Sequence, residues 1–212
     1  MLNVIAALRV GSVVAMPTDT VYGLAVDPTI PGATQRLFAL KGRSESVALP
    51  VLVSDLDAAR ALVGPLPEPA ATFASRYWPG PLTIVVERPA GSRAASFELG
   101  AERHTIGIRC PDHAVALQLL RATGPLAVTS ANRHGEPPLT ELAAVEEEFG
   151  ADVAAFVDGG RCDGRPSTVI ACTADGWRVL RAGPVSLAQL TELVGEVPLG
   201  AQAGPLVTSN DG

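Results

Sequence analysis

The sequence is poor in lysine, in aromatic residues and in long apolar runs. Of its 16 cationic residues one, Lys41, is a lysine, and aromatic residues make up 4% of the 212-residue chain. No apolar run reaches the roughly 20 residues that a membrane-spanning helix needs. The first residues, Met1-Leu2-Asn3-Val4, lack the cationic start of a signal peptide. We therefore expect a cytoplasmic protein that contacts no membrane.

Cysteine is also scarce, and the three cysteines have no paired spacing. Cys110, Cys162 and Cys172 are an odd number, and none of them forms the short C-x-x-C pair of a zinc site. Reduced structural thiols are the expectation that follows. We expect no metal site built from protein ligands.

Several familiar catalytic and nucleotide-binding motifs are missing. The chain has no G-x-x-x-x-G-K-[ST] loop and no G-x-G-x-x-G after its first expected strand. His104, His113 and His134 do not stand near a nucleophile-elbow sequence. A P-loop enzyme, a Rossmann dinucleotide enzyme and a Ser-His-Asp hydrolase are therefore poorly supported.

The overall composition is that of an ordinary globular protein. Apolar residues make up 47% and charged residues 18% of the chain, and the net charge is −6. A chain of this length forms one domain with a sizeable core. The negative charge argues against binding nucleic acid by bulk electrostatics, so we expect no stable nucleic-acid complex and only a locally positive phosphate site.

Apolar runs and helical periodicity alternate along the chain. This alternation predicts a layered α/β domain with one mixed sheet. The expected strands are 13–16, 21–26, 49–53, 82–86, 105–109, 126–128, 154–157, 167–170 and 178–181. We expect one folded domain over residues 1–197 and a flexible tail over 198–212, which is small, polar and rich in Gly and Pro.

Helix boundaries follow from capping residues. Gly42 ends the helix predicted over 33–40, while Asp112 and Thr140 are expected to begin two later helices. Ser186-Leu187-Ala188-Gln189 matches a capping box, which predicts the start of the last helix.

The single lysine stands in Lys41-Gly42-Arg43, directly at a predicted helix end. An ammonium and a guanidinium two residues apart can hold a polyphosphate from two sides. Alternatively, Lys41 is a solvated cation that interacts with the negative end of the helix dipole. The local sequence leaves both interpretations open.

Other polar groups fall where predicted strands end. Ligands bind in such places in open α/β sheets, so these groups can converge on one anionic, polar ligand. Taken singly, each is equally well explained as a turn residue or a surface pair. The groups are Thr18 to Thr20, Arg109, Ser130, Asn132, Ser167, Thr168 and Arg181.

Seven short stretches, in this order, resemble the YrdC-like L-threonylcarbamoyladenylate synthases over about residues 4–194. The resemblance implies a YrdC-like three-layer catalytic domain, in which helices pack around a single twisted mixed sheet with a deep cavity. The stretches are P-T-D-T-V-Y-G-L (17–24), K-G-R (41–43), W-P-G-P-L-T (78–83), G-I-R-C-P (107–111), S-A-N (130–132), P-S-T-V (166–169) and L-R-A-G (180–183).

The resemblance also implies which residues bind substrate. Lys41 and Arg43 would contact the ATP phosphates and serve as the catalytic pair. The rest of the nucleotide site would be Thr105, Ser130, Asn132 and Arg181, with Arg181 closing over the AMP part. L-Threonine would contact Thr20, Leu52, Arg109, the Val128 backbone and Ser167, with Arg109 and Ser167 at its carboxylate.

The activity implied is that of a nucleotidyltransferase in tRNA modification. L-Threonine, bicarbonate and ATP, with Mg²⁺, would give threonylcarbamoyl-AMP and pyrophosphate. Downstream enzymes would then transfer the threonylcarbamoyl group to tRNA. The alternative is a non-catalytic paralogue of the same fold that binds RNA or a nucleotide; it would be expected to lack the K-x-R and S-x-N pairs.

Overall fold

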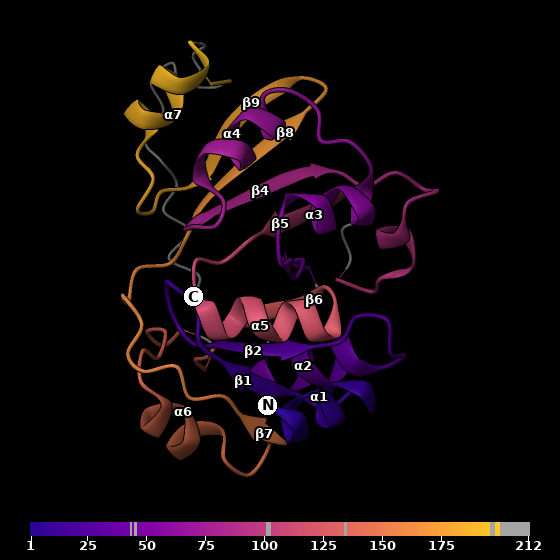
Figure 1. Ribbon diagram of the computed structural model, residues 1–212, viewed down its shortest axis with the longest axis vertical. Helices are drawn as coiled ribbons and strands as arrows, with labels where there is room; N and C mark the ends of the chain where they lie inside the picture. The colour runs from indigo at the N-terminus through magenta and orange to yellow at the C-terminus, as the bar shows by residue number, and fades with distance from the viewer. Residues whose placement is uncertain (43, 45, 101–102, 134, 196–197, 200–212) are drawn as a thin grey trace.

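The computed structural model describes residues 1–42, 44, 46–100, 103–133, 135–195 and 198–199, and its centre is a single nine-stranded sheet. The strand order is β7-β1-β2-β6-β3-β5-β4-β8-β9, which runs from the bottom to the top of Figure 1. The strands are β1 (Val14–Met16), β2 (Gly23–Val26), β3 (Val51–Leu52), β4 (Leu82–Glu87), β5 (Thr105–Arg109), β6 (Leu126–Ser130), β7 (Ala155–Phe156), β8 (Thr168–Thr173) and β9 (Gly176–Arg181).

The sheet mixes parallel and antiparallel neighbours. β1 with β7, β3 with β5 and β4 with β8 pair in parallel, and the remaining neighbours pair antiparallel. The prediction of one mixed α/β sheet is therefore confirmed.

Helices cover the sheet on both faces. Helices α2 (Ala33–Lys41), α3 (Leu56–Val63), α4 (Ala70–Tyr77), α6 (Leu142–Phe149) and α7 (Leu187–Val194) bury their apolar residues in the larger core. Helices α1 (Leu2–Arg9) and α5 (Ala114–Thr123) bury theirs in a second, smaller core. Figure 1 shows α5 crossing in front of β2 and β6. The sheet is thus the middle layer of three.

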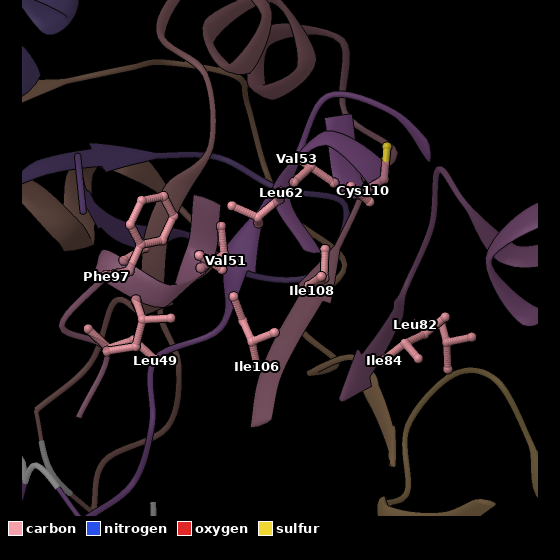
Figure 2. Close-up of a cluster of buried hydrophobic side chains, with 14 of the residues drawn as sticks. Leu49, Val51, Val53, Leu62, Leu82, Ile84, Phe97, Ile106, Ile108 and Cys110 are labelled. Atoms are coloured by element: carbon pink, nitrogen blue, oxygen red, sulfur yellow. The ribbon is translucent and has the colours of Figure 1, made fainter. Parts of the chain in front are cut away.

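The larger core lies beneath the middle strands. Val51, Ile108 and Ile84 face the same side because Ile108 pairs with both of the others across neighbouring strands. Leu62 of α3 and Phe97, from the segment before β5, pack with them (Figure 2). This side of the middle strands is therefore fully covered.

Two of the four predicted helix caps are confirmed. Gly42 ends α2 in the left-handed conformation, with φ of 58°, and Ser186 makes both bonds of a capping box with Gln189. The other two are wrong by one residue, because the cap position is set by backbone dihedral angles that several adjacent polar residues can adopt. His113, not Asp112, caps α5 through its ring, and Glu141, not Thr140, precedes α6 without a side-chain bond.

Residues 157–167, which we call the crossing segment, connect β7 at one edge of the sheet to β8 near the other. Gly164 N donates to Thr20 O at 2.7 Å, and Cys162 N donates to Thr140 O at 2.9 Å. The Tyr22 hydroxyl donates to Gly160 O at 3.0 Å. These bonds hold the segment against the turn that follows β1.

Two further predictions concern membranes and cysteines. Within the described ranges no helix is long and apolar enough to cross a membrane. The three cysteines are free and buried, as expected.

The predicted tail lies outside the described residues except for Pro198 and Leu199. Leu199 N donates to Trp177 O at 2.7 Å.

Candidate functional site

One half of a sheet face is incompletely covered. α1 and α5 pack on the strands from β7 to β3, on the face of the smaller core. On the same face, Thr105 and Gly107 of β5, Val85 of β4 and Val169 of β8 are only partly buried. Ile106 and Ile108, which alternate with them, are fully buried on the other face. The partly covered strip is where a ligand can lie against the sheet.

Cross-strand pairing places two predicted nucleotide residues at one level. Val51 pairs with Ile108 on one side and with Ala127 on the other. β5 runs parallel to β3, whereas β6 runs antiparallel to it. The third residue before Ile108, Thr105, and the third residue after Ala127, Ser130, therefore lie at the same position along the strand direction. Thr105 and Ser130 therefore lie across two strand spacings, about 10 Å apart.

Arg109 and Leu52, two of the predicted threonine residues, lie on the same face, away from Thr105 along the strand direction. Leu52 pairs with both Arg109 and Leu126, so these side chains share the face that carries Thr105. Arg109 is four strand residues beyond Thr105, a distance of about 13 Å. The predicted nucleotide and threonine residues thus share one face of the sheet. They stand at opposite ends of its strands.

Arg109 is the centre of the first polar cluster, which we call the Arg109 cluster. Its guanidinium donates from Nε to Gly80 O at 3.1 Å, from Nη1 to Thr20 Oγ1 at 2.9 Å, and from Nη2 to Asp19 Oδ1. Arg109 is 6% exposed, and burial lowers its pKa, an effect that the charge of Asp19 partly offsets. A guanidinium has five N–H groups, so two remain without a partner among the described residues.

The turn before β2 orients the other members of this cluster. The Thr18 hydroxyl donates to Val21 O at 2.7 Å, so the 2.9 Å contact between Thr18 Oγ1 and Thr20 Oγ1 takes its hydrogen from Thr20. Thr20 Oγ1 already accepts from Arg109 and keeps one lone pair. Asp19 Oδ2 is buried and accepts no hydrogen bond from any described residue.

Ser167 lies at the end of the crossing segment, beside β4 and β9. Its Oγ is 2.9 Å from Thr83 Oγ1 and accepts from Arg181 Nη2 at 3.2 Å. Arg181 Nε and Nη2 also donate to Ser167 O, at 3.1 and 3.0 Å. The predicted AMP residue Arg181 is therefore bonded to the predicted threonine residue Ser167. A Cβ at Gly183 would lie 2.4 Å from Thr168 N, so only glycine lets the chain after β9 pass this close.

Lys41 belongs to a second polar cluster, the Lys41 cluster, formed with Ser130 and Asn132. Its Nζ donates to Ser130 O at 2.9 Å, to Asn132 Oδ1 at 2.8 Å, and to Asn132 O. Lys41 is 5% exposed, so the interpretation as a solvated cation is wrong. It is the last residue of α2, on the opposite face of the sheet, and reaches the loop that follows β6.

Asn132 completes this cluster. Its Oδ1 accepts from Lys41 Nζ and from Ser130 Oγ, the latter at 2.6 Å. Its Nδ2 donates to Arg133 O at 2.9 Å and to Glu136 O at 2.7 Å. These four bonds use the full capacity of a side-chain amide. The prediction that Lys41 and Asn132 contact the nucleotide stays a prediction, and their described contacts hold the Ser130 loop in shape.

The remaining predicted residues differ in position. Leu52 and Val128 are buried in the smaller core, and Val128 N donates to Pro50 O at 3.0 Å. Thr105 begins β5 and is partly buried. Arg43 lies outside the described residues.

Asp19 lies within the predicted polar stretch Thr18 to Thr20 but was given no substrate contact, and Thr83 was given no role. Both stand inside the motifs that carry the resemblance, P-T-D-T-V-Y-G-L and W-P-G-P-L-T. The motif positions alone could have marked them for attention. What the sequence could not show is that Asp19 pairs with Arg109, 90 residues away.

One open hollow of the structure lies away from both polar clusters. It has a volume of about 610 Å³ and none of the predicted site residues lines it; the lining residues are Ser12, Val13, Arg36, Ala39, Leu40, Ala151, Asp152, Val153 and Ala154. It is open and contains no member of the two polar clusters, from which we assign the site. The deep cavity implied by the resemblance stays a prediction.

Comparison with known proteins identifies relatives of the chain. The Sua5_yciO_yrdC family model, described as "Telomere recombination", matches residues 6–183. A putative threonylcarbamoyl-AMP synthase of Mycobacterium leprae is 36% identical over 197 residues, covering 92% of this chain and 88% of that protein. The threonylcarbamoyl-AMP synthase of Bacillus subtilis is 38% identical over 194 residues, covering 91% of this chain and 56% of that protein.

Solved structures agree with the sequence comparison. The crystal structure of Pyrococcus abyssi Sua5 complexed with L-threonine superposes with a TM-score of 0.82 at 32% identity. The match covers 92% of this chain and 57% of that one. The chain therefore spans a little over half the length of the Bacillus and Pyrococcus proteins and most of the length of the mycobacterial one.

Proposed function

The chain belongs to the Sua5/YciO/YrdC family, and from this we propose that it is an L-threonylcarbamoyladenylate synthase. The proposed reaction joins L-threonine, bicarbonate and ATP into threonylcarbamoyl-AMP and releases pyrophosphate. It is a nucleotidyl transfer, and its product would be used by other enzymes to modify tRNA.

The observation that carries the proposal is the arrangement of the two polar clusters. The Arg109 cluster and the Ser130 loop lie on one face of the sheet, which includes the partly covered strip, and Arg109 is about 13 Å along the strand direction from Ser130 and Thr105. A molecule with an amino acid at one end and a nucleotide at the other has about this extent. This extent supports the proposal that one face of the sheet binds both substrates.

At the threonine end, Arg109 would bind the carboxylate of the substrate. Two N–H groups of its guanidinium have no described partner, and a carboxylate accepts two parallel N–H bonds from such a fork. Ser167 Oγ, held by Thr83 and Arg181, would be the second contact to the carboxylate. Thr20 would read the substrate through its remaining lone pair.

At the nucleotide end, the chemistry depends on position and charge. The carbamate formed from threonine and bicarbonate must attack the α-phosphate in line as pyrophosphate leaves. Lys41 and Arg43 would stabilise the phosphate charge, and Ser130, Asn132 and Thr105 would position the AMP part. The described contacts of Lys41 are hydrogen bonds to the Ser130 loop. Lys41 would therefore also help to bind the phosphates by holding that loop in position.

Magnesium is proposed to enter with ATP. Within the described ranges no group of three His, Cys, Asp or Glu side chains could hold a metal ion. In our proposal the triphosphate carries the ion, which needs no cage of protein ligands. We also propose a cytoplasmic location and no stable nucleic-acid binding, in keeping with the net charge of −6.

The direct test uses purified protein with ATP, L-threonine, bicarbonate and Mg²⁺. We expect pyrophosphate release that depends on both threonine and bicarbonate, with threonylcarbamoyl-AMP identified by mass spectrometry. Absence of threonine-dependent release would contradict the proposal. If release were absent while a tRNA anticodon stem-loop bound in a gel-shift assay, the non-catalytic alternative would replace it.

A further inference from the structure

In the turn that follows β1, the carboxylate of Asp19 has a hydrogen-bond donor at one of its two oxygens. Asp19 Oδ1 accepts from Arg109 Nη2, whereas Oδ2 is buried and has no partner among the described residues. The Asp19 side chain is 13% exposed and that of Arg109 is 7% exposed. A buried carboxylate oxygen without a donor is costly, so it is retained where a ligand supplies the donor.

The neighbouring hydroxyl has the same polarity. The hydrogen of Thr20 is donated to Thr18 Oγ1, and Thr20 Oγ1 keeps one lone pair after accepting from Arg109. Two adjacent residues of the turn therefore offer only acceptors. The ligand group that satisfies them must be a hydrogen-bond donor, and a cation satisfies the carboxylate best.

Arg109 offers the complementary half. Its guanidinium has two N–H groups without a described partner, which suit a carboxylate, and it is bonded to both Asp19 and Thr20. Donors for a carboxylate and acceptors for a cation thus stand next to each other. This is the pattern that fits the two charges of a zwitterionic α-amino acid, in which ammonium and carboxylate are attached to one carbon.

We propose that Asp19 binds the α-ammonium group of the amino-acid substrate through Oδ2 and so determines specificity for an amino acid. The inference rests on the proposed function, since it assigns a residue to the threonine end of that site. Asp19 also orients the amino nitrogen for carbamate formation. The ammonium first releases a proton, the amine nitrogen then attacks the carbon of bicarbonate, and water leaves as the carbamate forms. Arg109, which donates to the other oxygen of Asp19, binds the carboxylate of the same substrate molecule.

A purely structural role is the competing explanation. In that case Asp19 only pairs with Arg109, and its loss weakens every ligand that uses Arg109 by the same factor. The two roles differ in their dependence on the amino group. A ligand pair that differs only in this group therefore separates them.

The experiment measures binding of L-threonine and of (R)-3-hydroxybutyrate, which lacks the amino group, by isothermal titration calorimetry. We expect wild-type protein to bind threonine at least about tenfold more tightly, as a charge-assisted hydrogen bond predicts. In Asp19→Asn that ratio should fall toward one. L-2-Aminobutyrate, which keeps the ammonium and lacks the side-chain hydroxyl, should weaken in Asp19→Asn as strongly as threonine does.

Two controls accompany the variant. Asp57→Asn removes a carboxylate that pairs with Arg60 on the surface of α3, where Asp57 is 90% exposed, and should leave the ratio unchanged. Asp19→Glu keeps the charge that pairs with Arg109 but displaces the oxygens. It should fold even if Asp19→Asn does not, and its ratio should also fall.

The possible outcomes are distinct. An unchanged ratio in Asp19→Asn and Asp19→Glu, with both ligands weakened equally, would overturn the assignment of Asp19 and leave the proposed function standing. A wild-type ratio near one would overturn it without any variant. If wild-type protein bound no threonine in the presence of ATP, the proposed function itself would fail, and the assignment with it.

Discussion

The Lys41 and Arg109 clusters differ in how completely their polar groups are paired. Around Lys41, three acceptors match the three ammonium donors, and the Asn132 amide makes four bonds. Around Arg109, two N–H groups and Asp19 Oδ2 have no described partner. A complete network stabilises a loop, whereas an incomplete one is prepared for a ligand. Substitutions should therefore affect the two clusters differently.

Replacement of Arg109 should have the largest effect. Arg109→Met breaks a buried ion pair and leaves Asp19 unpaired, which should lower the free energy of unfolding by about 3–5 kcal/mol. Threonine binding should be lost while ATP binding persists in the molecules that remain folded. Urea denaturation and calorimetry at low temperature measure these quantities. The matched control Arg60→Met, at an exposed pair with Asp57, should cost at most about 1 kcal/mol.

Asn132→Ala should affect stability more than threonine binding. It removes one acceptor from Lys41 and leaves Arg133 O and Glu136 O without their donor, so we expect a loss of about 1–3 kcal/mol in urea denaturation. Asn132 has no described contact with the Arg109 cluster. A threonine affinity changed more than threefold would contradict the separation of the two clusters.

Lys41→Ala and Arg43→Ala should each reduce threonine-dependent pyrophosphate release at least tenfold, about 1.4 kcal/mol or more in transition-state stabilisation. Lys41 has described contacts to Ser130 and Asn132, whereas Arg43 lies outside the described residues. If Lys41 acts mainly through that loop, Lys41→Ala should also lower the melting temperature. Wild-type release rates in both variants would remove the pair from the mechanism.

Tyr22→Phe should have the smallest effect. The hydroxyl bonds Gly160 O and Gly159 N of the crossing segment, at 3.0 and 3.4 Å, and its loss should cost about 1 kcal/mol of unfolding free energy. Because the same segment carries Ser167, the KM for threonine should rise while the KM for ATP stays constant. Equal changes in both KM values would show that the segment does not act selectively on the Arg109 cluster.

The strands and most helices could be predicted because their information is local. Apolar runs mark the buried strands, and Gly42 and Ser186 act through their own backbone or through a residue three positions on. The caps at His113 and Glu141 were missed since adjacent polar residues compete for one cap position. Local sequence gives no basis for choosing between them.

The site could be predicted only as a set of residues. Family resemblance selected Arg109, Thr20 and Ser167, but not the pairing of Asp19 with Arg109 across 90 positions. The sequence also suggested that ligand groups gather where strands end. The structure shows instead that Thr105 and Arg109, at opposite ends of β5, share one face. That relation depends on register, which only the folded sheet defines.

The crossing segment is only slightly longer than the distance between the strands that it connects. From β7 to β8 the sheet order requires seven strand-to-strand steps, about 34 Å in a flat sheet. The 12 residue-to-residue steps from Phe156 to Thr168 reach about 40 Å when fully extended. The segment is therefore close to its full length between β7, at one edge of the sheet, and β8, next to the other edge (Figure 1). Its length limits how far β7 and β8 can move apart.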